Sequence, residues 1–223
     1  MKKAFSLIEV VFAIIIISIS LMSVPMLLKQ AAKSDEYSII QESILAASTK
    51  IENIISYPWD DSSYDATNKI LRVLDVSASG DSELKRDISS VNKNYRIGHV
   101  VANKRRRFFD SVAYPMGKFP TSGTTTYNNI SAFNGKMVTI GGNGAYDYKD
   151  NGITLSSKVY FISDKANYSL QNIVFNLNAS SVANSTNIKM IELNTTSPLL
   201  GKSFILRTFM CNIGQSNLLE RRK

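Results

Sequence analysis

The chain has 223 residues, enough for one domain of ordinary size beside an additional long helix. Its 44% hydrophobic content and five prolines argue against a disordered chain, and its net charge of +8 favours anionic partners without selecting one. His99 is the single histidine, which excludes histidine-based triads and multi-histidine metal sites. No phosphate-loop, serine-hydrolase or zinc-protease motif occurs. We therefore expect a protein that is not an enzyme and needs no cofactor.

The first 28 residues are the most apolar stretch of the chain. Lys2 and Lys3 open it, and the run from Val10 to Leu28 carries no charge. As a helix this run would rise about 28 Å, close to the roughly 30 Å hydrocarbon thickness of a bilayer. The lysines favour a cytoplasmic N-terminus. The stretch predicts one membrane-spanning helix.

Glu9 is a carboxylate at the head of this apolar run. An acidic side chain near the bilayer centre costs on the order of 2.5–3.5 kcal/mol. Charges at membrane depth are therefore usually paired and functional. A cation supplied at the same depth by a neighbouring chain would lower the cost of both charges.

Residues 3–10, KAFSLIEV, resemble the processing signal of type IV pilins and type II secretion pseudopilins. The resemblance implies that a prepilin peptidase cuts between Ala4 and Phe5 and methylates the new amine on Phe5. Glu9 would then neutralise the N-terminal amine of an adjacent subunit in a filament. Ala4 departs from the glycine that the family usually has before the cut. Pro25 matches the family's helix-kinking proline, slightly early, and should bend or loosen the helix because it lacks an N–H.

The helix is expected to continue well beyond the apolar run, because no helix breaker occurs before Pro58. Apolar residues recur every three or four positions, which is the period of one helix face. They are Tyr37, Ile40, Ile44, Ala47, Ile51 and Ile54. We expect one helix from Phe5 to about Ile55, near 75 Å long. A sheet from the same chain should cover the stripe, with a dimeric coiled coil as the alternative.

Trp59, the only tryptophan, lies in a stretch that resembles the segment after the long helix in minor pilins, IISYPWDDSSYD. It should cap the base of a sheet against the helix; the alternative is an exposed binding aromatic. Cys211 is the only cysteine, so no intramolecular disulfide can form. Its place in an apolar strand predicts a buried, unreactive thiol.

Residues 57–150 read as a variable, loop-rich αβ region with a short candidate strand at Arg96–Ala102. The densest positive charge is a run of four residues before two phenylalanines: Lys104, Arg105, Arg106 and Arg107. This run predicts a solvated loop, or a patch that binds nucleic acid. Glycines 141, 142 and 144 indicate a hairpin, and YDYKDNG indicates a turn more than a calcium site, although some pseudopilins bind calcium.

Residues 151–223 favour an antiparallel sheet. Its strands are expected at Lys158–Ile162, Asn172–Leu177, Ile188–Leu193 and Ser203–Cys211. In the last of these, Phe204, Leu206, Thr208 and Met210 should face the opposite side from Ile205, Arg207, Phe209 and Cys211. A long N-terminal helix followed by an antiparallel meander predicts an α+β fold of the type IV pilin kind.

The chain thus divides into a leader (1–4), a transmembrane and assembly helix (5–28), its amphipathic extension (29–56), the loop-rich region (57–150) and the sheet region (151–223). The resemblance implies a minor pilin or pseudopilin in the bacterial inner membrane, with its C-terminal domain in the periplasm before it joins a pilus or pseudopilus. Its partners would be other pilin subunits, the prepilin peptidase and the inner-membrane assembly platform. The alternatives are a DNA- or surface-binding tip module, and an uncleaved bitopic protein unrelated to pili.

Overall fold

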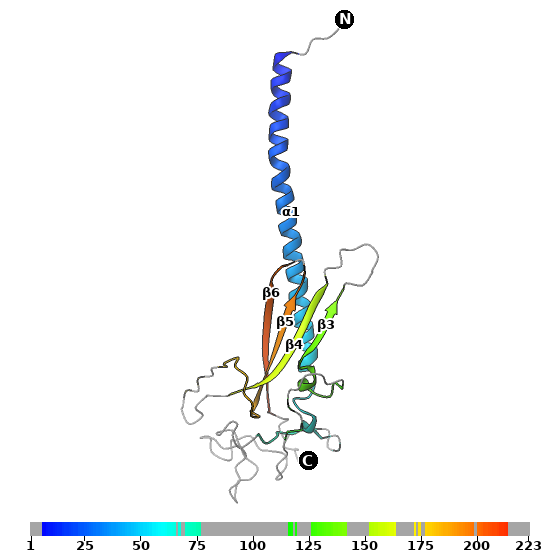
Figure 1. Cartoon of the computed structure of the whole chain (residues 1–223), viewed down its shortest axis with the longest axis vertical. Coiled ribbons are helices and arrows are strands. Elements are labelled where there is room, and N and C mark those ends of the chain that lie inside the picture. Colours follow the sequence, from blue (N-terminus) through cyan, green and yellow to red (C-terminus); the bar gives the residue numbers. More distant parts are fainter. Residues whose placement is uncertain are drawn as a thin grey trace, which may run out of the picture.

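The computed structural model describes residues 6–65, 67, 70–76, 116–117, 119, 126–141, 152–163, 172, 174, 177–198 and 200–213. One long helix, α1, is followed by a sheet that packs beside its C-terminal part (Figure 1). The predicted α+β architecture is confirmed. The elements are α1 (Leu7–Ile55), a 3-10 helix (Asp61–Ser63), β1 (Tyr64–Asp65), β2 (Ile70–Leu71), a second 3-10 helix (Ile130–Phe133), β3 (Lys136–Ile140), β4 (Ile153–Ile162), β5 (Ile188–Thr196) and β6 (Ser203–Cys211).

The observed bounds of α1 agree with the helix expected from the sequence. Ser6, in extended conformation, precedes the first turn, and Ser56 ends the last one just before Pro58. The helix runs without interruption through Pro25. It is therefore a single rod, and the proline does not divide it into two helices.

The four-stranded sheet is an antiparallel meander in the order β3-β4-β5-β6. β5 pairs with β4 on one side and with β6 on the other, so that Ile191 lies between Val159 and Thr208. A smaller sheet joins β1 and β2. The strands predicted around Lys158, Ile188 and Ser203 are confirmed, although β4 begins at Ile153 and is longer than expected.

The strand predicted at Asn172–Leu177 is wrong. Its described residues Asn172, Val174 and Leu177 do not belong to a strand, and Val174 is 77% exposed. β5 pairs with β4 from Thr154 to Ile162, which leaves no edge between them for an intervening strand. The fourth strand is instead β3, which lies in the region expected to be loop-rich and pairs with the first half of β4.

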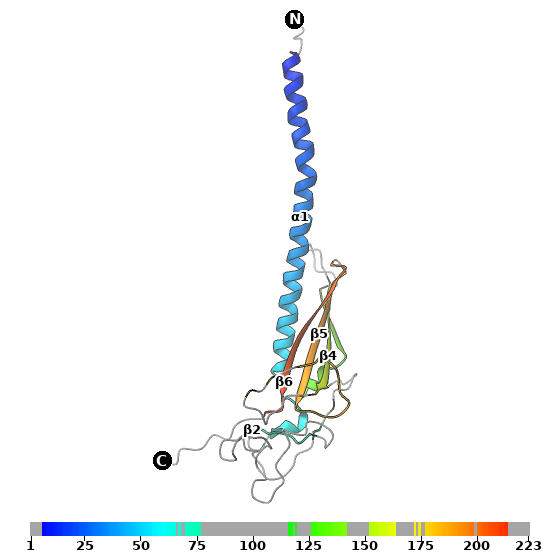
Figure 2. The same cartoon turned by 90° about the vertical axis from the view of Figure 1, so that its left-hand side faces the viewer.

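The hydrophobic core lies between the last turns of α1 and the inner face of the sheet. Ala47 and Ile54 are fully buried against residues such as Leu193 and Ile191. Tyr37, at the start of the predicted stripe, is 64% exposed. The sheet therefore covers only the C-terminal part of the stripe, as the side view shows (Figure 2).

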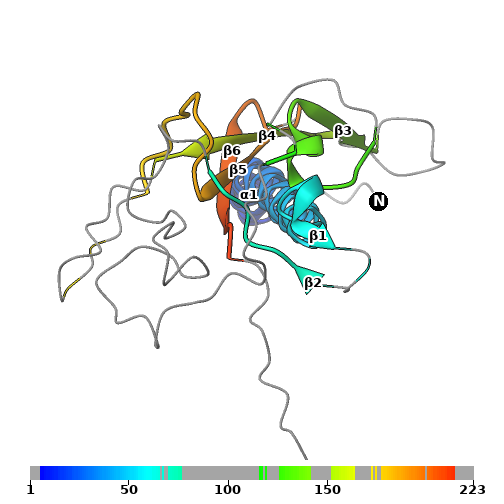
Figure 3. The same ribbon diagram turned by 90° about the horizontal axis from the view of Figure 1, so that it is seen from below.

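The alternation predicted for β6 is confirmed. Its partly buried residues face the helix: Phe204, Leu206, Thr208 and Met210. Ile205, Arg207 and Phe209 are exposed on the opposite face. Viewed from below, the sheet lies along one side of α1 (Figure 3). We call the described residues from Tyr57 to Ile213 the head.

Candidate assembly helix and the buried clasp of the head

Within the described part of the chain, the N-terminal half of α1 is exposed on all sides. Every residue from Leu7 to Leu28 is exposed, including the large apolar side chains that elsewhere fill cores. In the described part of the chain, α1 is the one helix long and apolar enough to cross a membrane. Exposed apolar surfaces of this size mark sites of contact with lipid or with other proteins. The chain therefore carries one N-terminal candidate membrane helix, compatible with a single-pass membrane protein.

Three serines in this half satisfy their hydroxyl groups within the helix. Ser18 donates to the Ile14 carbonyl over 2.7 Å, and Ser20 donates to the Ile16 carbonyl over 2.9 Å. Ser23 donates to Ser20 over 3.0 Å. In hydrocarbon an unpaired hydroxyl is costly, so this back-bonding makes the serines compatible with a lipid environment.

Glu9 lies in the first turn of α1 and is exposed. Among the described residues, none forms a hydrogen bond or an ion pair with its carboxylate. Its backbone N–H is the group that is engaged, donating to the Ser6 carbonyl over 3.0 Å. The structure thus places an acidic group on an apolar rod with no partner in the described part of its own chain.

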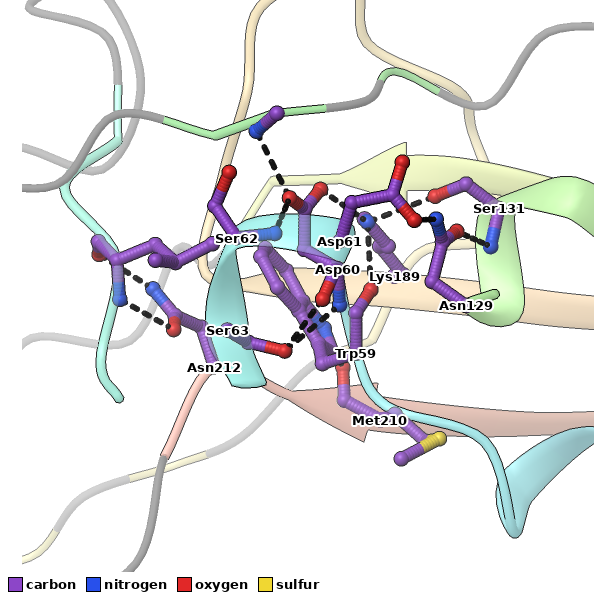
Figure 4. A network of polar contacts seen from close by, with 12 residues as sticks. Trp59, Asp60, Asp61, Ser62, Ser63, Asn129, Ser131, Lys189, Met210 and Asn212 are labelled. Carbon is purple, nitrogen blue, oxygen red and sulfur yellow. Dashed lines mark hydrogen bonds and ion pairs between the residues drawn. The ribbon is translucent and has the colours of Figure 1, made fainter. Parts of the chain in front are cut away.

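The head is joined to the end of α1 by a polar cluster around Lys189 (Figure 4). Lys189 projects from β5 onto the inner face of the sheet and is fully buried. Its Nζ donates to the Trp59 carbonyl over 2.8 Å and to Ser131 Oγ over 2.7 Å, and it forms an ion pair with Asp60 Oδ2 at 3.3 Å. We call Lys189, Asp60, Ser131 and Trp59 the clasp.

The clasp connects three segments that are distant in sequence. Trp59 and Asp60 follow α1, Ser131 lies in the second 3-10 helix, and Lys189 belongs to β5. The ammonium also lies 4.0 Å from the centre of the Trp59 ring, a cation–π distance. Burial lowers the pKa of Lys189 from 10.5 to about 8, and the Asp60 carboxylate opposes this shift.

Further hydrogen bonds to backbone groups connect the segment after α1 with the end of β6; we call this region, together with the clasp, the junction. Trp59 Nε1 donates to the Met210 carbonyl over 3.1 Å, so the ring is tied to β6. Asn212 accepts from the Leu74 N–H over 2.9 Å and donates to the Leu74 carbonyl over 2.6 Å. The predicted capping role of Trp59 is confirmed, and the exposed-aromatic alternative is wrong because the side chain is 5% exposed.

Comparisons with protein-family models, with curated proteins and with solved structures found no match to this chain.

Several site residues predicted from the sequence lie outside the described residues. They are the processing residues Ala4 and Phe5, His99, the candidate strand Arg96–Ala102, the aspartates of YDYKDNG and the basic run Lys104, Arg105, Arg106 and Arg107. Of the predicted site residues, the structure describes Glu9 and Pro25, both on the bare half of α1. Gly141 adopts φ 79° directly after β3, and β3 pairs antiparallel with β4, as a hairpin connection requires.

No group of three or more His, Cys, Asp or Glu side chains in the described ranges is arranged to hold a metal ion. Cys211 is only partly buried at the end of β6 and packs against the cluster of Tyr160, Ile188 and Met190. The clasp itself was not predicted. One signal in the sequence could have indicated it. Lys189 falls on the same side of its strand as Ile191 and Leu193, and a charged residue on a buried face requires a buried partner.

Proposed function

We propose that the chain is a minor pilin-like or pseudopilin-like structural subunit. A prepilin peptidase trims it between Ala4 and Phe5 and methylates Phe5, and residues 5–28 then join a bundle of helices in a type IV pilus or a type II secretion pseudopilus. Its contribution is assembly free energy and registry between subunits. Its partners are other subunits of the filament, the peptidase and the assembly platform.

One observation carries this proposal. The exposed apolar half of α1 bears Glu9 near its start, while the C-terminal end of the same helix is packed against the folded head. A plain membrane anchor has no use for a carboxylate at this depth, because the group adds only an insertion cost. A filament subunit does, because the trimmed amine of a neighbour offers a positive charge at the same depth.

The first test is the mass of the N-terminal peptide from the chain in its native membrane. The proposal expects a chain that begins at methylated Phe5. A chain that still begins at Met1 inside its working assembly would lack that amine, and the uncleaved bitopic alternative would replace the proposal.

The second test is Glu9→Gln, with Glu36→Gln as the matched control on the same helix, beyond the apolar run. Glu9→Gln should be cleaved normally but should be lost from cross-linked assemblies with other subunits. Glu36→Gln should assemble like the unmodified chain. Equal incorporation of both variants would contradict the role given to Glu9.

A further inference from the structure

The buried pair of Lys189 and Asp60 has surroundings suited to more than an ion pair. Both side chains are 0% exposed, and Lys189 Nζ lies 3.3 Å from Asp60 Oδ2. The centres of the Trp59 and Phe161 rings lie 4.0 Å and 5.3 Å from Nζ. A buried ion pair carries a desolvation cost that its mutual attraction offsets only in part.

The second carboxylate oxygen of Asp60 is held by two backbone donors. Oδ1 accepts from the Gly117 N–H over 2.8 Å and from the Ser62 N–H over 3.1 Å. A Cβ at Gly117 would collide with Ser62 Oγ, which would have to move, and would lie 3.3 Å from Asp60 Oδ1. Two backbone N–H groups on one oxygen are the arrangement that stabilises the oxyanion formed in acyl transfer.

We propose that Lys189 and Asp60 condense to an intramolecular amide, a covalent cross-link between β5 and the segment that follows α1. First, a proton passes from Nζ to Oδ2, which gives a neutral amine and a neutral carboxylic acid. The Nζ lone pair then attacks Asp60 Cγ, and the negative charge that forms on Oδ1 is held by the N–H groups of Ser62 and Gly117. Ser131 Oγ accepts a hydrogen bond from Nζ and so positions the amine.

The step is completed without any further reactant. Nζ gives a second proton to the hydroxyl group at Oδ2, the Cγ–Oδ2 bond breaks, and one water leaves as the carbonyl at Oδ1 re-forms. The ammonium and the carboxylate thus become one amide and one water, with no oxidation or reduction.

Three features favour the reaction. Burial holds the pKa of Lys189 at about 8, so the amine is far easier to deprotonate than that of an exposed lysine. The product is a neutral amide, which removes the two buried charges and their desolvation cost. The reacting groups are already in contact, so little entropy is lost in bringing them together.

The cross-link would join residue 60, directly after the long helix, to a central strand of the sheet. If the chain is a filament subunit, as proposed above, a pull on α1 would reach the sheet through a covalent bond. The chemistry itself depends only on the clasp and not on that function.

The test is a peptide map of the full chain, purified from membranes in detergent, unfolded and digested with trypsin. Trypsin should normally release peptides 51–69, 166–189 and 190–202. With the amide formed, Lys189 resists trypsin, and peptide 51–69 is found joined to 166–202 at a mass lower by one water. Recovery of 51–69 and 166–189 as separate peptides of unchanged mass would overturn the proposal.

Variants and an internal control assign the bond to its residues. Asp60→Asn should give the same cross-linked mass, because an amide side chain condenses with loss of ammonia. Asp60→Ala should give none, and a cross-link in that variant would exclude Asp60 as the partner. Lys158, which lies opposite Glu192 in the β4–β5 register, should be cut normally. The N-terminal peptide of the same digest reports leader removal separately, so failure of the cross-link and failure of the proposed function can be told apart.

Discussion

Ile54 provides the sharpest test of the packing between helix and sheet. It is 0% exposed and belongs to the core cluster that contains Trp59 and Ile191. Ile54→Ala removes three buried carbons, worth about 0.8 kcal/mol each, and leaves a cavity, so we expect a loss of about 3–4 kcal/mol in the free energy of unfolding. Ile55→Ala is the matched control, because the neighbouring isoleucine is 40% exposed and should lose less than about 1 kcal/mol.

The assay is urea unfolding of the full chain in detergent, followed by the fluorescence of Trp59. This residue is the only tryptophan and is buried in the same cluster, so its emission reports the junction directly. Similar losses for the Ile54 and Ile55 variants would refute the packing of α1 against the sheet through Ile54.

Three further predictions concern the junction and the sheet. Asn212→Ala should leave the buried Leu74 N–H unpaired, cost about 1–3 kcal/mol and accelerate hydrogen exchange of the Leu74 amide. Gly201→Ala should cost about 1–2 kcal/mol in urea unfolding, because Gly201 has φ 58° in the β5–β6 turn. The third prediction applies to freshly refolded chain that lacks the cross-link. Its free energy of unfolding should rise between pH 8 and 10.5 relative to that of the Lys189→Met variant. The reason is that over this range Lys189 binds a proton in the unfolded chain but loses it in the folded chain. Chain that carries the amide should not show that rise, and a fall over this range would contradict the lowered pKa.

The helix, β5 and β6 could be predicted from the sequence because each shows a periodic pattern of apolar residues within a short stretch of chain. The stripe through Ala47 and Ile54 has the helical period, and the alternation of β6 has the period of a strand. The same reasoning missed the start of β4, where Ser156 and Ser157 break the apolar pattern. Ser157 is nevertheless buried, because its hydroxyl donates to the Phe133 carbonyl over 2.6 Å. That partner is set by the fold and cannot be seen in a local window.

The clasp was missed for the same physical reason on a larger scale. Asp60 and Lys189 are far apart along the chain, and each is of a residue type that usually lies on the surface. The folded sheet places Lys189 Nζ 4.0 Å from the centre of the Trp59 ring, a contact that no local stretch of sequence reveals. The wrong strand at Asn172–Leu177 shows the complementary error. Its residues have strand character, but β4 and β5 pair directly with each other and leave no place between them for a strand.

The last turns of α1 supply one side of the hydrophobic core of the head, and this determines where the chain can be shortened. A fragment that begins at residue 57 would strip Ala47 and Ile54 from the sheet and present Leu193 and Ile191 to water. Such a fragment should precipitate. A fragment that begins near Glu36 lacks the apolar N-terminal half of α1. It retains every residue of α1 that is buried, and it should therefore stay in solution.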